Sequence, residues 1–413
     1  MSETSISIVG AGIVGASAAL ALQRDGHRVT LLDRQEPCAG ASFGNAGVIA
    51  NASCLPTAMP GIAIDALRML SNSKAPLSIK PAYFHKILPW LLRFVLESRR
   101  SRVESNARNL YALTNRAVEA WHVLTDGTDL SGLLEDGDWL KVYESEQSFA
   151  STNNARALMD EIGTPYQLLT AGDIQDLEPQ LAPIFARGIL LDDTLRVVNP
   201  QKMVQGMVDL FVRNGGSYRT FDVQTIDIVG DNIELKNPND SLSTQKVLIA
   251  AGAWSGSLAK QMGNRLPLDT ERGYHIMLPP VNGKLLSRPV MSGDAAFVLS
   301  PMETGLRVTS QVEFAGLDAA PDYRHIRSLL PEVIRMLPGV DAMEDSVWMG
   351  CRPSLPDSLP VLGRAARSEN VLYAFGHQHL GMTLGPITGL IIADLVAGRK
   401  PDIDLTPYRP SRY

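Results

Sequence analysis

Three glycines stand close together near the start of the chain, in the stretch SISIVGAGIVG. They are Gly10, Gly12 and Gly15, and they directly follow a short apolar run. Glycines at this spacing serve either a tight turn that matters only for folding or a cradle in which backbone N–H groups meet a phosphate. The cradle requires a strand before the glycines and a helix after them, so the flanking residues decide between the two interpretations.

The flanking residues read as a strand, a helix and a second strand. Residues 5–9 form an apolar run with the alternation of a strand, residues 14–25 are rich in Ala and Leu, and residues 28–33 (RVTLLD) end at Asp33. Asp33 lies 18 positions beyond Gly15, close to the ~20 at which an acidic side chain reaches a ribose hydroxyl in such units. This βαβ context favours the phosphate cradle.

Each residue of the predicted cradle has its own role. Gly10 permits the turn, Gly12 leaves room between the backbone and a pyrophosphate, and Gly15 lets the helix approach the strand. The helix N-terminus offers unpaired N–H groups to the anion, and Asp33 accepts hydrogen bonds from the adenosine ribose. Both nicotinamide and flavin cofactors carry an ADP half, so this pattern leaves the choice between them open.

A second glycine-rich loop leads into a helix near the end of the chain. The stretches RPSLPDSLPVLGR and VLYAFGHQHLGMTLGP precede an apolar helix expected over residues 386–396 and closed by Gly398. One interpretation is a second anion site, suited to the negative charge at the N1–C2=O edge of a reduced flavin. The other is a terminal helix that only completes the core.

Two further elements are predicted between these ends. Asn199 and Pro200 read as the N-cap and first residue of a helix that ends at residues 214–216. Its apolar stripe consists of Met203, Val204, Met207, Val208 and Phe211. The stretch KVLIAAGAWS continues as a strand over residues 247–251 and runs into Gly252, which would extend the buried sheet.

The composition is that of a globular protein with a small-molecule partner. The 413 residues are 45% hydrophobic and 20% charged, which suits two domains rather than one. A net charge of -6 argues against nucleic-acid binding, which needs a basic face. The three cysteines, Cys38, Cys54 and Cys351, suggest neither a disulfide framework nor a metal site and favour a reducing, cytoplasmic location. Neither a secretory signal nor an apolar run long enough to span a bilayer is visible.

The segment over residues 84–102, FHKILPWLLRFVLESRRSR, combines an apolar stretch with six residues that can carry positive charge. It could rest peripherally on the anionic cytoplasmic face of an inner membrane and pass electrons to a quinone. The favoured interpretation is a buried helix with a solvated basic end.

The motifs together resemble the D-amino acid oxidase-like flavoproteins, most closely the bacterial D-amino acid dehydrogenases. The matching stretches are GAGIVG with Asp33, GASFGNAG (40–47), APLSIKP (75–81), GCRPSLPDSLPVLG (350–363), GHQHLGMT (376–383) and GRKPDIDLTPYRPSRY (398–413). The resemblance implies an α/β fold with a Rossmann-type, glutathione reductase-like FAD-binding domain and a second α+β substrate domain on a mixed or antiparallel sheet. The expected FAD-binding domain comprises residues 1–82, 195–264 and 344–413, and the substrate domain comprises residues 83–194 and 265–343.

The resemblance also implies which residues hold FAD. Related sarcosine oxidases bind their flavin through a cysteine, but the matching position here is Gly350 rather than Cys351, so FAD is expected to be held non-covalently. In the flavin loop, the backbone of His377 and His379 is expected to matter more than their rings. The predicted cofactor-binding residues are Gly10, Gly12, Ile13, Val14, Gly15, Asp33, Arg34, Ala41, Ser42, Asn45, Ala46, Gly47, Val48, Ala251, Gly252, Trp254, Gly376, His377, His379, Leu380, Gly381, Met382 and Thr383.

Three residues are the predicted catalytic and substrate-binding group. Arg352 matches the arginine that binds the substrate carboxylate in amino acid oxidases, a role that suits a guanidinium fork; a surface salt bridge is the alternative. Tyr274 either donates its hydroxyl to the carboxylate or fills the roof of the site. His275 stands where the dehydrogenases carry a small polar residue, which suggests a cyclic or hydroxylated D-imino acid such as D-hydroxyproline, although a packed histidine is the favoured interpretation.

The resemblance implies oxidation of a D-amino or imino acid, with hydride transfer from Cα to flavin N5 and electrons passing to a quinone or another acceptor. The rivals are an oxidase of the glycine or sarcosine type that releases hydrogen peroxide, and a non-catalytic dinucleotide-binding subunit. An NAD-dependent dehydrogenase is a weaker interpretation, because it would not explain the carboxy-terminal loop and helix. The side-chain preference, the electron acceptor and the oligomeric state are left open.

Overall fold

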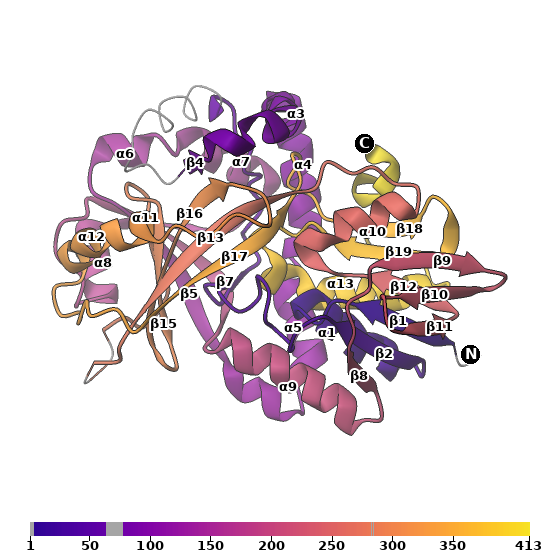
Figure 1. Ribbon diagram of the computed structural model, residues 1–413. Coiled ribbons are helices and arrows are strands. Elements are labelled where there is room, and N and C mark those ends of the chain that lie inside the picture. Colours follow the sequence, from indigo (N-terminus) through magenta and orange to yellow (C-terminus); the bar gives the residue numbers. More distant parts are fainter. Residues whose placement is uncertain (1–3, 63–76, 282, 284) are drawn as a thin grey trace.

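The computed structural model describes residues 4–62, 77–281, 283 and 285–413, and it contains two large sheets (Figure 1). The smaller of the two carries both ends of the chain beside it, and the larger extends away from it. The α/β fold with a parallel and a mixed sheet agrees with the expected fold class.

The smaller sheet has six strands in the order β18-β19-β12-β1-β2-β8, and all neighbours are parallel except β18 and β19. Side chains alternate along each strand, so the sheet has an apolar core on each face. Leu248 packs with the helices on one face, whereas Val247 and Ile249 pack on the other. The strand bounds are β1 Ser5–Val9, β2 Arg28–Asp33, β8 Ser217–Thr220, β12 Lys246–Ile249, β18 Val361–Ala365 and β19 Ser368–Phe375.

A three-stranded antiparallel sheet packs on the second of these faces. It consists of β9 Thr225–Val229, β10 Asn232–Lys236 and β11 Ser241–Thr244. Ile226, Ile233 and Leu235 join the apolar core with Leu258 of α10 (Ser255–Gln261). The six-stranded sheet is therefore covered on both faces, as expected for a parallel sheet.

The larger sheet has ten strands and is mixed. Eight follow the order β17-β13-β16-β15-β14-β5-β7-β3, while β4 pairs with β16 and β6 with β7. The bounds are β3 Val48–Ala50, β4 Leu77–Ile79, β5 Leu134–Tyr143, β6 Gln167–Thr170, β7 Arg187–Val197, β13 Asp269–Leu278, β14 Val290–Ser292, β15 Phe297–Met302, β16 Gly305–Phe314 and β17 Ser346–Ser354. The antiparallel register of β13 and β17 sets Arg352 opposite Glu271 and Gly350 opposite Gly273.

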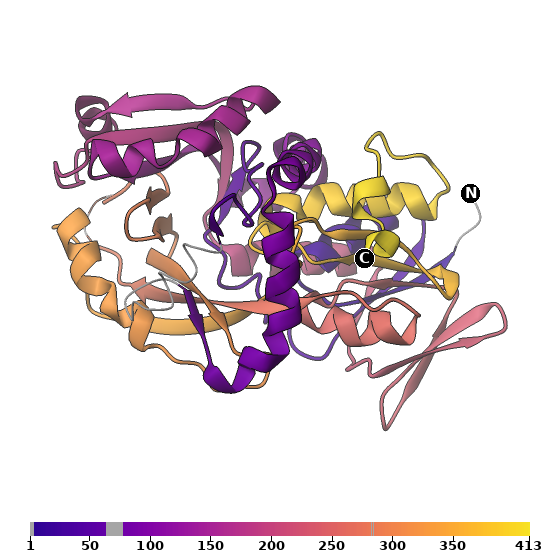
Figure 2. The same ribbon diagram turned by 90° about the horizontal axis from the view of Figure 1, so that it is seen from above.

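The helices lie around these sheets, as Figure 2 shows from above. The helix α13 packs closely on α1, because a Cβ at Gly389 would lie 2.7 Å from the backbone of Ser17. The bounds of the remaining helices and of this pair are α1 Ile13–Arg24, α3 Phe84–Glu97, α4 Arg100–Thr114, α5 Ala117–Thr125, α6 Glu146–Ala150, α7 Asn153–Ile162, α8 Ala171–Leu177, α9 Pro200–Arg213, α11 Arg324–Ser328, α12 Leu330–Met336 and α13 Gly381–Val396.

The elements predicted from local patterns are confirmed. The first strand, the first helix and the second strand are β1, α1 and β2. The N-cap of α9 is Asn199, whose side chain accepts a hydrogen bond from the backbone N–H of Lys202 at 3.0 Å. The five residues of its predicted apolar stripe are all buried.

The carboxy-terminal helix begins earlier than predicted. It starts at Gly381, so Pro386 lies inside it rather than in its first turn. A proline lacks the N–H that would bond the carbonyl four residues before it. Here that carbonyl belongs to Met382 and accepts a hydrogen bond from the indole Nε1 of Trp121 at 3.0 Å, so the helix continues without a buried unpaired oxygen.

The predicted division into domains stays a prediction. The strands β3, β4 and β17 belong to the ten-stranded sheet, although their residues fall in the ranges assigned to the FAD-binding domain. The first two residues of the APLSIKP stretch, at positions 75 and 76, lie outside the described residues.

The helix α3 is not the buried helix that the sequence favoured. Its fully buried side chains are Ile87 and Trp90; Trp90 packs against Phe314 of β16, with ring centroids 5.2 Å apart. A series of large apolar side chains on the same helix is exposed instead: Phe84, Leu88, Leu92, Val95 and Leu96. No helix within the described residues combines the length and apolarity needed to cross a membrane.

Candidate active site

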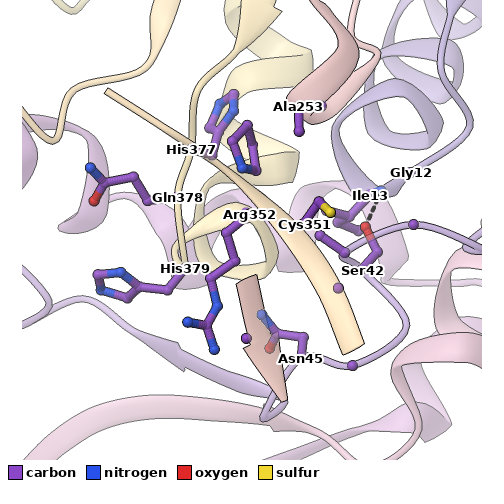
Figure 3. Close-up of a pocket in the computed structure, with 18 of the residues that line it drawn as sticks. Gly12, Ile13, Ser42, Asn45, Ala253, Cys351, Arg352, His377, Gln378 and His379 are labelled. Atoms are coloured by element: carbon purple, nitrogen blue, oxygen red, sulfur yellow. Dashed lines mark hydrogen bonds between the residues drawn. The ribbon is translucent and has the colours of Figure 1, made fainter. Parts of the chain in front are cut away.

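A cavity of about 790 Å³ extends from the glycine turn after β1 to the face of the ten-stranded sheet. Figure 3 shows part of its wall, with Gly12, Ile13 and Ser42 on one side and Arg352, His379 and Asn45 on another. The cavity is lined by segments from the start, middle and end of the chain. It is therefore the place where the predicted motifs can act together.

The glycine turn has the tight geometry that its spacing predicted. Gly10 has φ +113°, and a Cβ there would lie 2.4 Å from the carbonyl oxygen of Ala250. A Cβ at Gly15 would lie 1.8 Å from the carbonyl oxygen of Gly10. The helix and the strand therefore approach so closely that only glycine fits between them. Gly12 is the N-cap of α1 and offers no side chain. The N-terminus of α1 is thus open to the cavity, and the Ile13 N–H donates to the Ser42 hydroxyl at 3.0 Å.

The next part of the cavity carries Asp33 at the end of β2. Its carboxylate accepts hydrogen bonds from the backbone N–H of Ala11 at 2.7 Å and of Gln35 at 3.0 Å. Beside it, the guanidinium of Arg34 lies 3.9 Å from the centre of the Trp254 ring. A carboxylate held by hydrogen bonds at the end of β2, next to the glycine turn, suits the ribose of a dinucleotide.

The loop over residues 40–47 is held against the ten-stranded sheet by Arg307. The guanidinium of Arg307 donates to the carbonyl oxygens of Phe43 at 3.0 Å and Asn45 at 2.7 Å. Burial lowers the pKa of Arg307 to about 10, so it stays charged near neutral pH. The Asn45 side chain accepts from the Gly47 N–H at 2.7 Å, which fixes the end of the loop.

The N-terminus of α13 forms another part of the wall, through Gly381, Met382 and Thr383. The first N–H groups of a helix have no acceptor within it, and they carry partial positive charge. The preceding His377 is buried, and its Nε2 lies 3.0 Å from the hydroxyl oxygen of Thr388. Burial lowers the pKa of His377 to about 3, so its ring is neutral.

Arg352 projects from β17 into the cavity. Its Nη1 donates to the backbone carbonyl oxygen of Gln311 at 3.0 Å, and its side chain crosses Gly273, where a Cβ would lie 2.1 Å from Nη2. Among the described residues Arg352 forms no ion pair, although Glu271 faces the same cavity. Burial lowers the pKa of Arg352 and the charge of Glu271 opposes that change. A buried guanidinium with free N–H groups is suited to an incoming carboxylate.

The structure agrees with the packed histidine favoured for His275, and it gives no support to the substrate contacts suggested for Tyr274 and His275. The Tyr274 ring packs in the core on the far side of the sheet, and its hydroxyl donates to Glu313 at 2.6 Å. His275 does not line the cavity; its ring clusters with those of Phe43 and Trp348, whose centroids lie 5.9 and 5.3 Å from it and 5.6 Å from each other. Burial lowers the pKa of His275 to about 3. Alternation along β13 sends the two side chains to opposite faces of the sheet.

Most predicted cofactor-binding residues line the cavity. Three glycines do not, namely Gly15, Gly47 and Gly376. Each has instead a close approach that excludes a side chain; a Cβ at Gly47 would lie 2.4 Å from the Val197 carbonyl oxygen. The predicted residues that do line it are Gly10, Gly12, Ile13, Val14, Asp33, Arg34, Ala41, Ser42, Asn45, Ala46, Val48, Ala251, Gly252, Trp254, His377, His379, Leu380, Gly381, Met382 and Thr383, with Arg352. Tyr274 also belongs to the lining, although its ring packs in the core on the far side of the sheet.

Several lining residues were not identified from the sequence. They include Glu271 of β13, Gln311 of β16 and Trp348 of β17. Burial raises the pKa of Glu271. No local signal marked Glu271 or Gln311, since Glu271 lies in the polar run DTER (269–272) and Gln311 lies in TSQVE (309–313).

Comparisons with known proteins concern the family and the fold. A family model described as "FAD dependent oxidoreductase" (DAO) matches residues 5–395. The chain is 33% identical to a D-amino-acid oxidase of Bradyrhizobium diazoefficiens, over 99% of this chain and 98% of the other. It is 28% identical to a D-amino acid dehydrogenase of Rhizobium rhizogenes, over 99% of both chains. Among solved structures, glycine oxidase from Geobacillus kaustophilus is similar with a TM-score of 0.74, 22% identity and 99% coverage of both chains.

Proposed function

The chain belongs to the DAO family of FAD-dependent oxidoreductases, and from that premise we propose that it oxidises the Cα–N bond of a D-amino acid or a cyclic D-imino acid, with D-proline and D-hydroxyproline as candidates. The observation that carries the proposal is Arg352, a buried guanidinium in the cavity wall whose one hydrogen bond to a described residue goes from Nη1 to the Gln311 carbonyl oxygen. Relatives named for D-amino acids at 33% and 28% identity support the same class of substrate.

The residues present fit FAD. The glycine turn packs so closely on the backbone of Ala250 that a Cβ at Gly10 would clash with it, and the N-terminus of α1 next to this turn suits a diphosphate. Asp33 would hold the adenosine ribose, and the N-terminus of α13 would face the isoalloxazine. We propose that the cofactor is held without a covalent bond, since burial raises the pKa of the Cys351 thiol and the neutral thiol is a poor nucleophile.

When bound, FAD supplies the acceptor for the hydride of the substrate Cα–H. Arg352 binds the substrate carboxylate through two N–H groups and so fixes the position of Cα. The wall of β13, β16 and β17 keeps that carboxylate out of bulk water, which strengthens the charge interaction. A substrate that arrives as the free amine needs no side-chain base, because its nitrogen lone pair assists the departure of hydride. The resulting imine hydrolyses or, if cyclic, persists.

His275 lends no support to a hydroxylated substrate, since its ring lies outside the cavity lining. The substrate panel described below therefore tests whether D-hydroxyproline is preferred. Two acceptors are compatible with the family. We propose a dehydrogenase that uses a quinone; an oxidase that releases hydrogen peroxide is the second candidate, favoured by the relative named D-amino-acid oxidase at 33% identity.

A substrate panel tests the proposed function. Purified protein should be yellow, and D-proline, D-hydroxyproline, D-alanine, sarcosine and glycine are added without oxygen. At least one D-amino or D-imino acid should abolish the visible flavin absorption, and acid precipitation should release the chromophore into the supernatant. Hydrogen peroxide formed at the rate of turnover in air would identify the oxidase, and quinone reduction without peroxide the dehydrogenase. A protein that is not reduced by any of the five would contradict the proposal.

The exposed face of α3 supports a membrane-bound quinone as acceptor. Phe84, Leu88 and Leu92 are 48%, 40% and 60% exposed and follow one another at helical spacing, so they form one stripe. Exposed cationic side chains accompany the stripe: Lys86, Arg93, Arg99, Arg100 and Arg102. Figures 1 and 2 show α3 on the outside of the ten-stranded sheet. We propose that this face lies on an anionic bilayer, where each cation contributes about 1 kcal/mol.

Vesicle flotation tests this contact. The triple variant Leu88→Ser, Leu92→Ser, Leu96→Ser should lose at least about 10-fold in binding to anionic vesicles, since each buried leucine contributes about 1.5–3 kcal/mol. Trp90 is unsuitable for this test, because it is buried and its Nε1 donates to the Ser354 carbonyl oxygen.

The matched control is Ile228→Ser with Val229→Ser, two exposed apolar residues of β9, which should float like the wild type. Binding should also fall with added salt. Equal flotation of the wild type and the triple variant would contradict the contact, and loss of a dimer in the triple variant would assign the face to a second copy of the chain.

A further inference from the structure

We propose that the carboxamide of Gln311 recognises the amino group of the substrate, beside the guanidinium of Arg352 that binds its carboxylate. The proposal rests on the proposed function, because it names a second substrate contact in the same site. Gln311 would then be a specificity-determining residue that separates amino and imino acids from carboxylates without nitrogen.

The position of Gln311 follows from its contact with Arg352. Its backbone carbonyl oxygen accepts from Arg352 Nη1 at 3.0 Å, and both residues line the cavity. The amino and carboxyl groups of an α-amino acid share one carbon atom. A residue that recognises the amine must therefore lie next to the residue that binds the carboxylate, and Gln311 meets this condition.

The side chain of Gln311 has an unused acceptor. Its Nε2 donates to the Ser78 hydroxyl at 3.5 Å, which directs the amide nitrogen toward β4. Its Oε1 is buried with no hydrogen-bond partner among the described residues, and the residue as a whole is 7% exposed. A buried polar atom without a partner is costly, and an N–H group of the substrate would supply the missing donor.

The backbone at Gln311 departs from regular strand geometry. Its φ is +79°, in the left-handed region that non-glycine residues adopt only at a cost. The register of β13 with β16 shifts here, since Arg272 pairs with Glu313 whereas Tyr274 pairs with Ser310. The sheet therefore has an extra residue on β16, and such bulges redirect side chains next to functional sites.

Two other polar groups near Arg352, the Tyr274 hydroxyl and the Glu271 carboxylate, are less suited to the amine. The Tyr274 hydroxyl is occupied by Glu313. Glu271 lies opposite Arg352 in the register, and its charge opposes the lowering of the pKa of Arg352. Loss of the Glu271 charge should alter the binding of every anion at Arg352, with or without an amine, and this difference separates Glu271 from Gln311.

Paired ligands test the proposal. The ligands are D-alanine with propionate and D-proline with cyclopentanecarboxylate, in which carbon or hydrogen replaces the nitrogen. Gln311→Met should raise the KM for the amino or imino acid by about 3- to 10-fold, the loss expected for a hydrogen bond to a neutral amine. The inhibition constant of the partner carboxylate should stay within about twofold of the wild-type value. Gln311→Glu, which keeps an acceptor, should restore much of the affinity for the amine.

The structure provides a matched control in Gln378. It is also a buried glutamine with positive φ (+48°) in the cavity wall, and its Nε2 donates to the Leu355 carbonyl oxygen at 2.8 Å, but unlike that of Gln311 its Oε1 is not a buried acceptor without a partner. Gln378→Met should change the KM of the amino or imino acid and the inhibition constant of its partner carboxylate by the same factor. Glu271→Gln should do the same. The inference is wrong if Gln311→Met weakens the binding of the amino or imino acid and of its partner carboxylate equally. It is also wrong if Gln311→Glu binds the amino or imino acid no more tightly than Gln311→Met does. If the wild type oxidises neither D-alanine, D-proline nor another member of the substrate panel, the proposed function itself fails.

Discussion

Replacing Arg352 by alanine should raise the KM of the preferred amino or imino acid by roughly 30- to 5,000-fold, which corresponds to about 2–5 kcal/mol for loss of a buried, hydrogen-bonded charge partner. The substrate carboxylate would otherwise enter a buried wall without a cation. The visible spectrum of the flavin should persist, because Arg352 projects from β17 of the ten-stranded sheet and not from the glycine turn. Steady-state kinetics and an absorption spectrum check both expectations.

The conservative variant and a distant arginine serve as controls. Arg352→Lys keeps a positive charge but loses the planar fork, so its KM should lie between those of the wild type and of Arg352→Ala. Arg335→Ala removes a partly exposed arginine of α12 that pairs with Glu332 and Glu144, and its KM should be that of the wild type. Undiminished turnover of a carboxylate substrate by Arg352→Ala would refute the assignment of the substrate site.

The same contact can be disturbed without removing the arginine. A Cβ at Gly273 would lie 2.1 Å from Nη2 and 2.2 Å from Cζ of Arg352, so Gly273→Ala should displace the guanidinium and raise the KM in the same direction. Gly137→Ala is the matched change in another strand of the sheet, where a Cβ has its nearest neighbour at 3.8 Å.

Gly10→Ala should yield a protein that is purified without FAD or does not fold. A Cβ at this position would lie 2.4 Å from the carbonyl oxygen of Ala250, which is backbone and cannot move aside, and φ is +113°. The displaced turn would no longer present the N-terminus of α1 to the diphosphate. The ratio of absorbance near 450 nm to that at 280 nm measures the FAD retained, and circular dichroism reports whether the chain folds.

Gly26→Ala separates steric conflict from backbone strain. Gly26 has φ +83° and follows the same helix, but no atom lies within 4 Å of a Cβ there. This variant should lose about 1 kcal/mol of stability from the strained backbone and retain its FAD. Full occupancy of Gly10→Ala by FAD would refute the predicted cradle.

The sequence was sufficient for features that depend on near neighbours along the chain. The glycines at positions 10, 12 and 15 and the acid at position 33 act within one βαβ unit, so their spacing predicts their geometry directly. The N-cap at Asn199 and the apolar stripe of α9 are equally local. Arg352 was also identified, although through its RP motif and the resemblance to a family rather than through its spacing.

Features that depend on contacts between helices and strands far apart in the sequence could not be predicted from local patterns. The start of α13 moved to Gly381 because the indole of Trp121, far away in the sequence, satisfies the carbonyl that Pro386 leaves free. For α3 the sequence favoured the buried interpretation over the surface one, because the pattern of the helix does not reveal how little of it the sheet covers.

The nucleotide end of the site was thus determined by the sequence alone, because a turn, a helix N-terminus and a neighbouring strand are set by local backbone conformation. The substrate end was decided by the tertiary structure. Alternation along β13 turned Tyr274 into the core, aromatic stacking withdrew His275 from the cavity, and the bulge in β16 brought Gln311 to Arg352. The face that a strand residue presents depends on register and bulges between distant strands, and these are set only when the sheet assembles.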